Sequence, residues 1–145
     1  MAWAAQLLPT DIWQWLPLWK SYQTFYRVDI PESITQLTWK RFFHPAEPMF
    51  CAVAKQEGRI VGFVHYLFHR STWAESDYCY LEDLFVDPQL RGRGIARQLM
   101  QALRAEAKEQ GWSRLYWHTR TDNPARRLYD EFTPADDYVR YRITC

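Results

Sequence analysis

The fold of this chain is decided by one stretch, Leu81-Glu82-Asp83-Leu84-Phe85-Val86-Asp87-Pro88-Gln89-Leu90-Arg91-Gly92-Arg93-Gly94-Ile95-Ala96. Its first half is typical of a buried β-strand that ends at Asp87-Pro88, and the apolar spacing after Gly94 is typical of an α-helix. Backbone N–H groups at a helix N-terminus bind anions, and glycines let a phosphate approach the backbone closely. The stretch therefore predicts a strand, a loop that binds a pyrophosphate, and a helix.

The spacing of the glycines excludes two common phosphate-binding loops. A P-loop needs Gly, four residues and then Gly-Lys-Ser/Thr, and the dinucleotide fingerprint needs Gly-x-Gly-x-x-Gly early in a βαβ unit. Here the pattern is Gln89-x-x-Gly92-x-Gly94, with Ala96 two residues later. A Gly-x-Gly pair alone is also typical of an ordinary turn that caps a helix, so the flanking residues have to decide between the two interpretations.

The chain before this stretch is expected to form two helices and two strands. Residues 10–27 have apolar side chains at helical spacing, with Pro17 expected to kink or delay the helix, and a second short helix begins at Pro31. Residues 50–55 and 59–68 are β-rich and are separated by a glycine-containing turn. With the strand 78–86 they predict an antiparallel meander.

The chain after the stretch predicts a helix from Gly92 to Gln110, with Ile95, Leu99 and Leu103 on its apolar face. A strand (113–119), a helix (123–131) and a final strand (138–144) follow. A strand, a crossover helix and a further strand imply a parallel pair inside a mixed sheet. We expect residues 1–145 to form a single α/β domain.

Composition limits the partners of the chain. It has 145 residues, 48% of them hydrophobic, and a net charge of +1, so no overall charge attracts it to nucleic acid or to a membrane surface. Its three cysteines, Cys51, Cys79 and Cys145, have no C-x-x-C spacing and predict neither a disulfide framework nor a metal site. We expect a cytoplasmic protein without a metal.

Four segments together resemble the GNAT superfamily of N-acetyltransferases. They are Val61-Gly62-Phe63, Tyr80-Leu81-Glu82-Asp83-Leu84-Phe85-Val86, Arg91-Gly92-Arg93-Gly94-Ile95-Ala96 and Asn123-x-Ala125-x-x-Leu128-Tyr129. The second segment is most similar to the diamine/polyamine and histone/polyamine acetyltransferase branches. The resemblance implies a central mixed, mostly antiparallel twisted sheet with a splayed parallel strand pair, flanked by about four helices.

The resemblance also implies acetyl-CoA as cosubstrate and indicates which residues bind it. These residues are Leu84, Phe85, Val86, Arg91, Gly92, Arg93, Gly94, Ile95, Ala96, Arg97, Asn123 and Arg126. The chain departs from the family at one place, because Asp122 stands where the family has its asparagine and Asn123 follows one position later.

Two catalytic residues are implied by the resemblance. Tyr129 matches the tyrosine that protonates the departing thiolate, although a tyrosine beside Leu128 on an amphipathic helix also fits a core position. Glu82 matches a glutamate that acts as general base through water, although it could equally only attract a cationic substrate. Asp83 lies on the opposite strand face by period-2 alternation and is the weaker base. His65, His69 and His118 are interpreted as structural.

The function that follows is transfer of the acetyl group of acetyl-CoA to a primary amine, by direct attack in a ternary complex. A polyamine or another small amine is favoured as acceptor, and a protein lysine, an N-terminal amine or an amino acid is the alternative. A non-catalytic acyl-CoA sensor is an alternative from another class. A homodimer is expected by the same resemblance.

Overall fold

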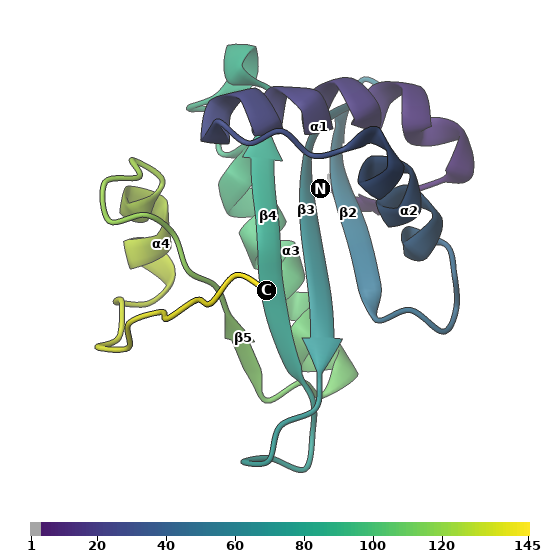
Figure 1. The fold of residues 1–145 in the computed structure, drawn as a ribbon. Coiled ribbons are helices and arrows are strands. Elements are labelled where there is room, and N and C mark those ends of the chain that lie inside the picture. The colour runs from purple at the N-terminus through teal and green to yellow at the C-terminus, as the bar shows by residue number, and fades with distance from the viewer. Residues whose placement is uncertain (1–3) are drawn as a thin grey trace.

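The computed structural model describes residues 4–145, in which five strands form one sheet (Figure 1). In spatial order the strands are β1 (Ala4–Gln6), β2 (Met49–Gln56), β3 (Arg59–His69), β4 (Tyr78–Val86) and β5 (Arg114–Tyr116). Neighbouring strands are antiparallel except β4 and β5, which are parallel. The predicted mixed, mostly antiparallel sheet is confirmed, whereas the short β1 was not predicted.

The two faces of the sheet are covered by different helices. α1 (Ile12–Tyr26) and α2 (Glu32–Phe42) lie on one face, and α3 (Ile95–Gln110) lies on the other (Figure 1). α4 (Arg126–Phe132) lies beyond β5, and two short 3-10 turns precede α1 and α3. α1 continues through Pro17. Among residues 4–145, no helix is both long enough and apolar enough to cross a membrane.

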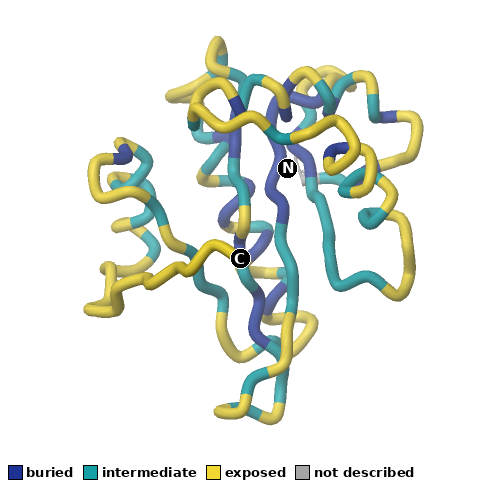
Figure 2. Tube along the Cα trace, in the orientation of Figure 1, coloured by how far each residue is buried: buried dark blue, intermediate teal, exposed yellow. Residues whose placement is uncertain are grey.

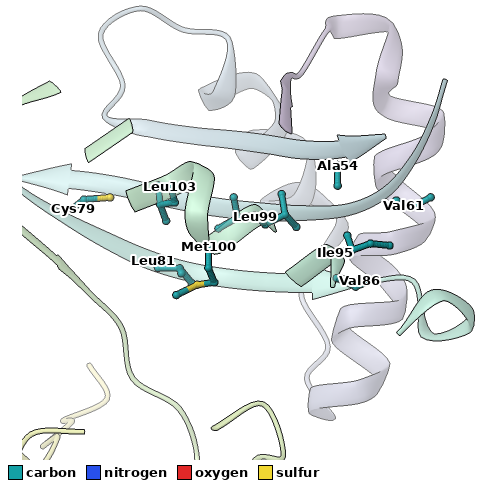
Figure 3. Packing of buried hydrophobic residues seen from close by; sticks show 10 residues of the cluster. Ala54, Val61, Cys79, Leu81, Val86, Ile95, Leu99, Met100 and Leu103 are labelled. Atoms are coloured by element: carbon teal, nitrogen blue, oxygen red, sulfur yellow. The ribbon is translucent and has the colours of Figure 1, made fainter. Parts of the chain in front are cut away.

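Strand alternation divides the core into two clusters. On the α3 face, Leu99, Met100 and Leu103 are almost fully buried against Val64 and Leu81 (Figure 3). The opposite face holds an aromatic cluster that joins α1 and α2 to the sheet: Trp15, Trp19, Trp39, Phe42, Phe63 and Phe85. The predicted apolar face of α3 is therefore confirmed. Both clusters contain residues of β4, and β4 carries four of the predicted site residues, Glu82, Leu84, Phe85 and Val86.

A close approach of β3 to β4 requires glycine at position 62. A Cβ atom there would lie 3.0 Å from the Phe85 carbonyl oxygen and 3.3 Å from Val86 Cγ2. We expect Gly62→Ala to lower the free energy of unfolding by about 1–3 kcal/mol, because the strands must shift to admit the methyl group. Urea denaturation measures the change. Gly58→Asn is the control, since position 58 is open and asparagine tolerates its positive φ; equal stability of Gly62→Ala and the wild type would contradict the explanation.

The predicted C-terminal strand (138–144) is wrong. These residues are extended but pair with no strand, and Tyr138, Tyr141 and Ile143 are 75–90% exposed (Figure 2). A strand needs a neighbour for its backbone N–H and C=O groups. β5 spans only three residues instead of the predicted 113–119, so it offers a short edge. Residues 138–144 alternate as a strand would, but no strand within residues 4–145 pairs with them.

Candidate active site

A cleft of about 480 Å³ opens between β4, the glycine loop, the end of α1 and the start of α4. Most of the predicted site residues line it: Leu84, Phe85, Val86, Arg91, Gly92, Gly94, Ile95, Ala96, Arg97, Asn123 and Tyr129. Arg93, Arg126 and Glu82 are not in this lining. The structure thus brings Leu84 and Tyr129, which are 45 positions apart in the sequence, to the same cleft.

The edge of β4 that faces the cleft has no strand beside it. β5 pairs only with Tyr78–Tyr80, whereas Leu84, Phe85 and Val86 pair with β3 alone. The two parallel strands therefore diverge after Tyr80. Backbone N–H and C=O groups on the free side of Leu84–Val86 are available to an extended ligand, as in strand addition.

The glycine loop has the conformation that only glycine adopts easily. Gly92 has φ 81° and Gly94 has φ 80°, and Gly94 is the N-cap of α3. The loop therefore presents the first N–H groups of α3 to the cleft, where the helix dipole favours an anion. The Arg91 guanidinium lies over the rings of Phe25 and Phe85, 4.7 and 5.1 Å from their centroids.

Three predicted contact residues have protein partners that fix them. Asn123 is buried; its Nδ2 donates to the hydroxyls of Thr119 (2.8 Å) and Tyr26 (3.2 Å), and its Oδ1 accepts from the Ala125 N–H. It thereby ties the turn before α4 to α1. Arg97 forms an ion pair of 2.6 Å with Glu131, and Arg126 donates to the backbone oxygen of Thr121.

Tyr129 lines the cleft from the first turns of α4. Its ring meets Trp117 edge-on, with centroids 5.4 Å apart. Burial, and secondarily the neighbouring Tyr26, raises the pKa of Tyr129 above its ordinary value. The hydroxyl therefore stays protonated at neutral pH and can donate a hydrogen bond to a group in the cleft.

A β-bulge changes the interpretation of the acidic pair on β4. His65 lies opposite Asp83 and Tyr66 lies opposite Leu81, so Glu82 is the extra residue of the bulge. The expectation that Asp83 occupies the opposite face from Glu82 is wrong, because a bulge interrupts the alternation. Asp83 points to the α1 side, where the side chains of Tyr22 and His65 contact it.

Asp83 is the end of a buried hydrogen-bond network. Tyr22 donates to its Oδ1 (2.5 Å), and His65 Nδ1 lies 2.9 Å from its Oδ2. Trp15 Nε1 donates to His65 Nε2 over 3.0 Å. An indole only donates, so His65 accepts at Nε2 and carries its proton at Nδ1, facing the carboxylate. Tyr22 and His65 therefore hold the Asp83 carboxyl group in place from two sides.

Glu82 lies next to this network and differs from Asp83 in its surroundings. Partial burial of its carboxyl group and the charge of Asp83 raise the pKa of Glu82, while Tyr80 and His65 lower it by a smaller amount. A carboxylate with a raised pKa is a better proton acceptor. The bulge thus places a carboxyl group with a raised pKa beside Asp83.

Two further histidines have protein partners. His69 contacts the Arg70 backbone oxygen through Nδ1 and the Tyr116 hydroxyl through Nε2, both at 2.7 Å. His118 Nε2 lies 3.3 Å from the Tyr80 hydroxyl. No group of three or more His, Cys, Asp or Glu side chains within residues 4–145 is arranged to hold a metal ion.

The sequence model of the Acetyltransferase (GNAT) family matches residues 13–133, which include both core clusters and the whole cleft. The chain belongs to the GNAT family. It is an acyl-CoA-dependent N-acetyltransferase, as the names of its relatives also show.

Relatives of this GNAT chain act on different amines. It is 32% identical to the D-amino-acid N-acetyltransferase HPA3 of Saccharomyces cerevisiae, over 92% of this chain and 85% of the relative. It is 30% identical to the thialysine N-epsilon-acetyltransferase of Mus musculus, over 70% and 64%. A ribosomal-protein-alanine N-acetyltransferase from Brucella melitensis shares the fold, with a TM-score of 0.80, 24% identity, and coverage of 98% and 97%.

Six further residues line the cleft of this GNAT enzyme and were not predicted as coenzyme contacts: Phe25, Tyr26, Leu90, Pro124, Ala125 and Leu128. Phe25 and Tyr26 lie at the end of α1, and the sequence pattern does not show which sheet edge this end reaches. The network of Tyr22, His65 and Asp83 was missed because it depends on the bulge. An acidic pair in the middle of an otherwise apolar and aromatic strand is the local signal for it.

Proposed function

We propose that this enzyme transfers the acetyl group of acetyl-CoA to a primary amine of a small molecule by direct attack in a ternary complex. The observation that carries the proposal is the single cleft that joins the free edge of β4, the glycine loop and Tyr129. The pyrophosphate needs the anion-binding loop, the extended arm needs the free strand edge, and the thiolate needs a proton donor such as Tyr129.

We assign the coenzyme contacts to backbone groups first. Leu84, Phe85 and Val86 take the pantetheine arm through their free edge, and Gly92 to Ala96 take the pyrophosphate through N–H groups at the start of α3. Side chains that add charge or contacts around the phosphates are Arg91, Arg93, Arg97, Asn123 and Arg126.

In the proposed reaction an N–C bond forms and a C–S bond breaks. The acceptor ammonium first loses a proton to Glu82, through water, because an amine with a pKa of about 10.4 is almost fully protonated at neutral pH. An N–H on the free edge of β4 polarises the thioester carbonyl. Tyr129 donates its hydroxyl proton to the departing thiolate, and the second proton that the nitrogen loses as the amide forms passes to solvent. Asp83 lies beside Glu82 and is held by Tyr22 and His65.

Free-thiol release from acetyl-CoA tests this function with a panel of polyamines, diamines, amino acids, aminoglycosides and lysine peptides. We expect release with at least one small primary amine and identify the acetylated nitrogen by mass spectrometry. Turnover only with a peptide would favour a protein lysine or N-terminal amine as acceptor. Coenzyme binding without turnover of any amine would favour the acyl-CoA sensor and contradict the proposal.

Gly94→Ala tests the pyrophosphate site. Space exists for a methyl group, but the φ of 80° costs a non-glycine residue about 1–2 kcal/mol and the methyl group enters the cleft lining. We expect the Kd for acetyl-CoA to rise about tenfold, measured by calorimetry. Gly111→Ala is the matched control, because position 111 has φ 77° at the other end of α3; a Kd raised equally in both variants would contradict the site.

The proposal includes a cytoplasmic homodimer that acts without nucleic acid or membrane as partner. The free thiols of Cys51, Cys79 and Cys145 support a cytoplasmic location. The near-neutral net charge supports a function without nucleic acid or membrane as partner. The exposed apolar side chains of the C-terminal segment support self-association. Light scattering measures the mass, and a monomer at micromolar concentration would contradict the dimer.

A further inference from the structure

The C-terminal segment returns to the sheet near β5 and β4 (Figure 1). After α4 it runs back on the side of the sheet that carries α1 and α2 (Figure 1). There Arg140 Nη1 lies 2.7 Å from His118 Nε2. This contact places a C-terminal cation beside the segment that follows β5.

A continuous row of side chains connects Arg140 to the acidic pair. The His118 ring is stacked on the Tyr80 ring, with centroids 5.6 Å apart and an interplanar angle of 27°. His118 Nε2 is 3.3 Å from the Tyr80 hydroxyl, and that hydroxyl interacts with the Glu82 carboxylate. Three successive side-chain contacts therefore link the Arg140 guanidinium to the Glu82 carboxylate.

The charge of Arg140 has no protein carboxylate to neutralise it in the described part of the chain, since none lies within 4.0 Å. A guanidinium only donates hydrogen bonds, so His118 accepts from it as a neutral ring. Arginine presents five N–H groups in a planar fork that matches a carboxylate. Because one of these groups meets His118, the others are left for a ligand.

We propose that Arg140 binds a carboxylate of the acceptor, so that the substrate is an amino acid or another amine that carries a carboxylate. Glu82 and Asp83 attract the ammonium end, and Arg140, held by His118, takes the anionic end. A polyamine has no anion for Arg140 and would be repelled by it. This inference rests on the proposed acetyl transfer and names the substrate class for the same site.

The test compares each amino acid, in its L and D forms, with the amine that remains after removal of its carboxylate, such as lysine with 1,5-diaminopentane. We expect the wild type to prefer the carboxylate-bearing member. Arg140→Gln should lower its kcat/KM about 10- to 100-fold, mainly through KM, because a hydrogen-bonded charge pair is lost. The decarboxylated amine should react as fast as before or faster, and Arg140→Lys should retain part of the preference.

Arg142→Gln is the matched control, because it removes the same charge from the same exposed segment. An equal loss for both members of a pair in Arg140→Gln would overturn the inference, as would a wild-type preference for diamines or polyamines. Either result would leave the proposed acetyl transfer intact. Absence of thiol release with every amine would instead overturn both proposals.

Discussion

Tyr129→Phe is expected to lower kcat by about 100-fold or more, the usual contribution of a positioned proton donor, while the Kd for acetyl-CoA stays unchanged. Only the hydroxyl is removed, so the ring still packs against Trp117 and the cleft keeps its shape. Because burial raises the pKa of Tyr129, the hydroxyl is protonated throughout the neutral range. The hydroxyl therefore still carries the proton that the departing thiolate takes up, and solvent replaces this proton after release.

Single-turnover kinetics separates this effect from product release, and calorimetry gives the coenzyme affinity. Tyr141→Phe serves as the control, because Tyr141 is 90% exposed on the C-terminal segment. An unchanged kcat in Tyr129→Phe across the pH range would remove the residue from the mechanism. A weaker coenzyme affinity with unchanged kcat would make it a binding residue instead.

Glu82→Gln is expected to lower kcat/KM by about 100-fold at neutral pH, since a general base contributes on this order. Only the carboxylate accepts a proton, so wild-type activity should fall as the pH drops through the pKa of Glu82. Burial and Asp83 raise this pKa above the ordinary 4.5, which moves the acidic limb toward neutrality. In the variant that limb should disappear, and the remaining rate should rise with pH as more amine becomes neutral.

The same profile separates a base from a carboxylate that only attracts the substrate. If Glu82 acts by attraction alone, Glu82→Gln should raise the KM of the amine and keep the acidic limb. Glu109→Gln, at the exposed end of α3, controls for loss of one negative charge. If the acidic limb remained in Glu82→Gln, the group that titrates there would be a residue other than Glu82.

Elements with strong local patterns were predicted well. The strand before the glycine loop ends where expected, and α3 buries Ile95, Leu99 and Leu103 as its spacing predicts. These features depend on neighbours in the sequence, because helical period, strand alternation and glycine conformation act over a few residues. The glycine loop was predictable for the same reason.

Elements that need distant partners were predicted poorly. β1 exists because Ala4–Gln6 pairs with Ala52–Ala54, and the segment 138–144 forms no strand because no free edge receives it. The alternation of apolar and polar residues shows which face of a strand is buried. It does not show which other segment pairs with that strand. The local sequence pattern therefore missed one strand that exists, β1, and predicted one that does not form, residues 138–144.

The sequence by itself determined the family and the position of the glycine loop, and it named Tyr129 and Glu82 as the groups to test. Only the tertiary structure decided which side chains surround the two acids. The bulge brings Asp83 to His65 and Tyr22, and the return of the C-terminal segment brings Arg140 to His118. A bulge and a long-range contact depend on which strands and segments become neighbours, and one stretch of sequence does not contain that information.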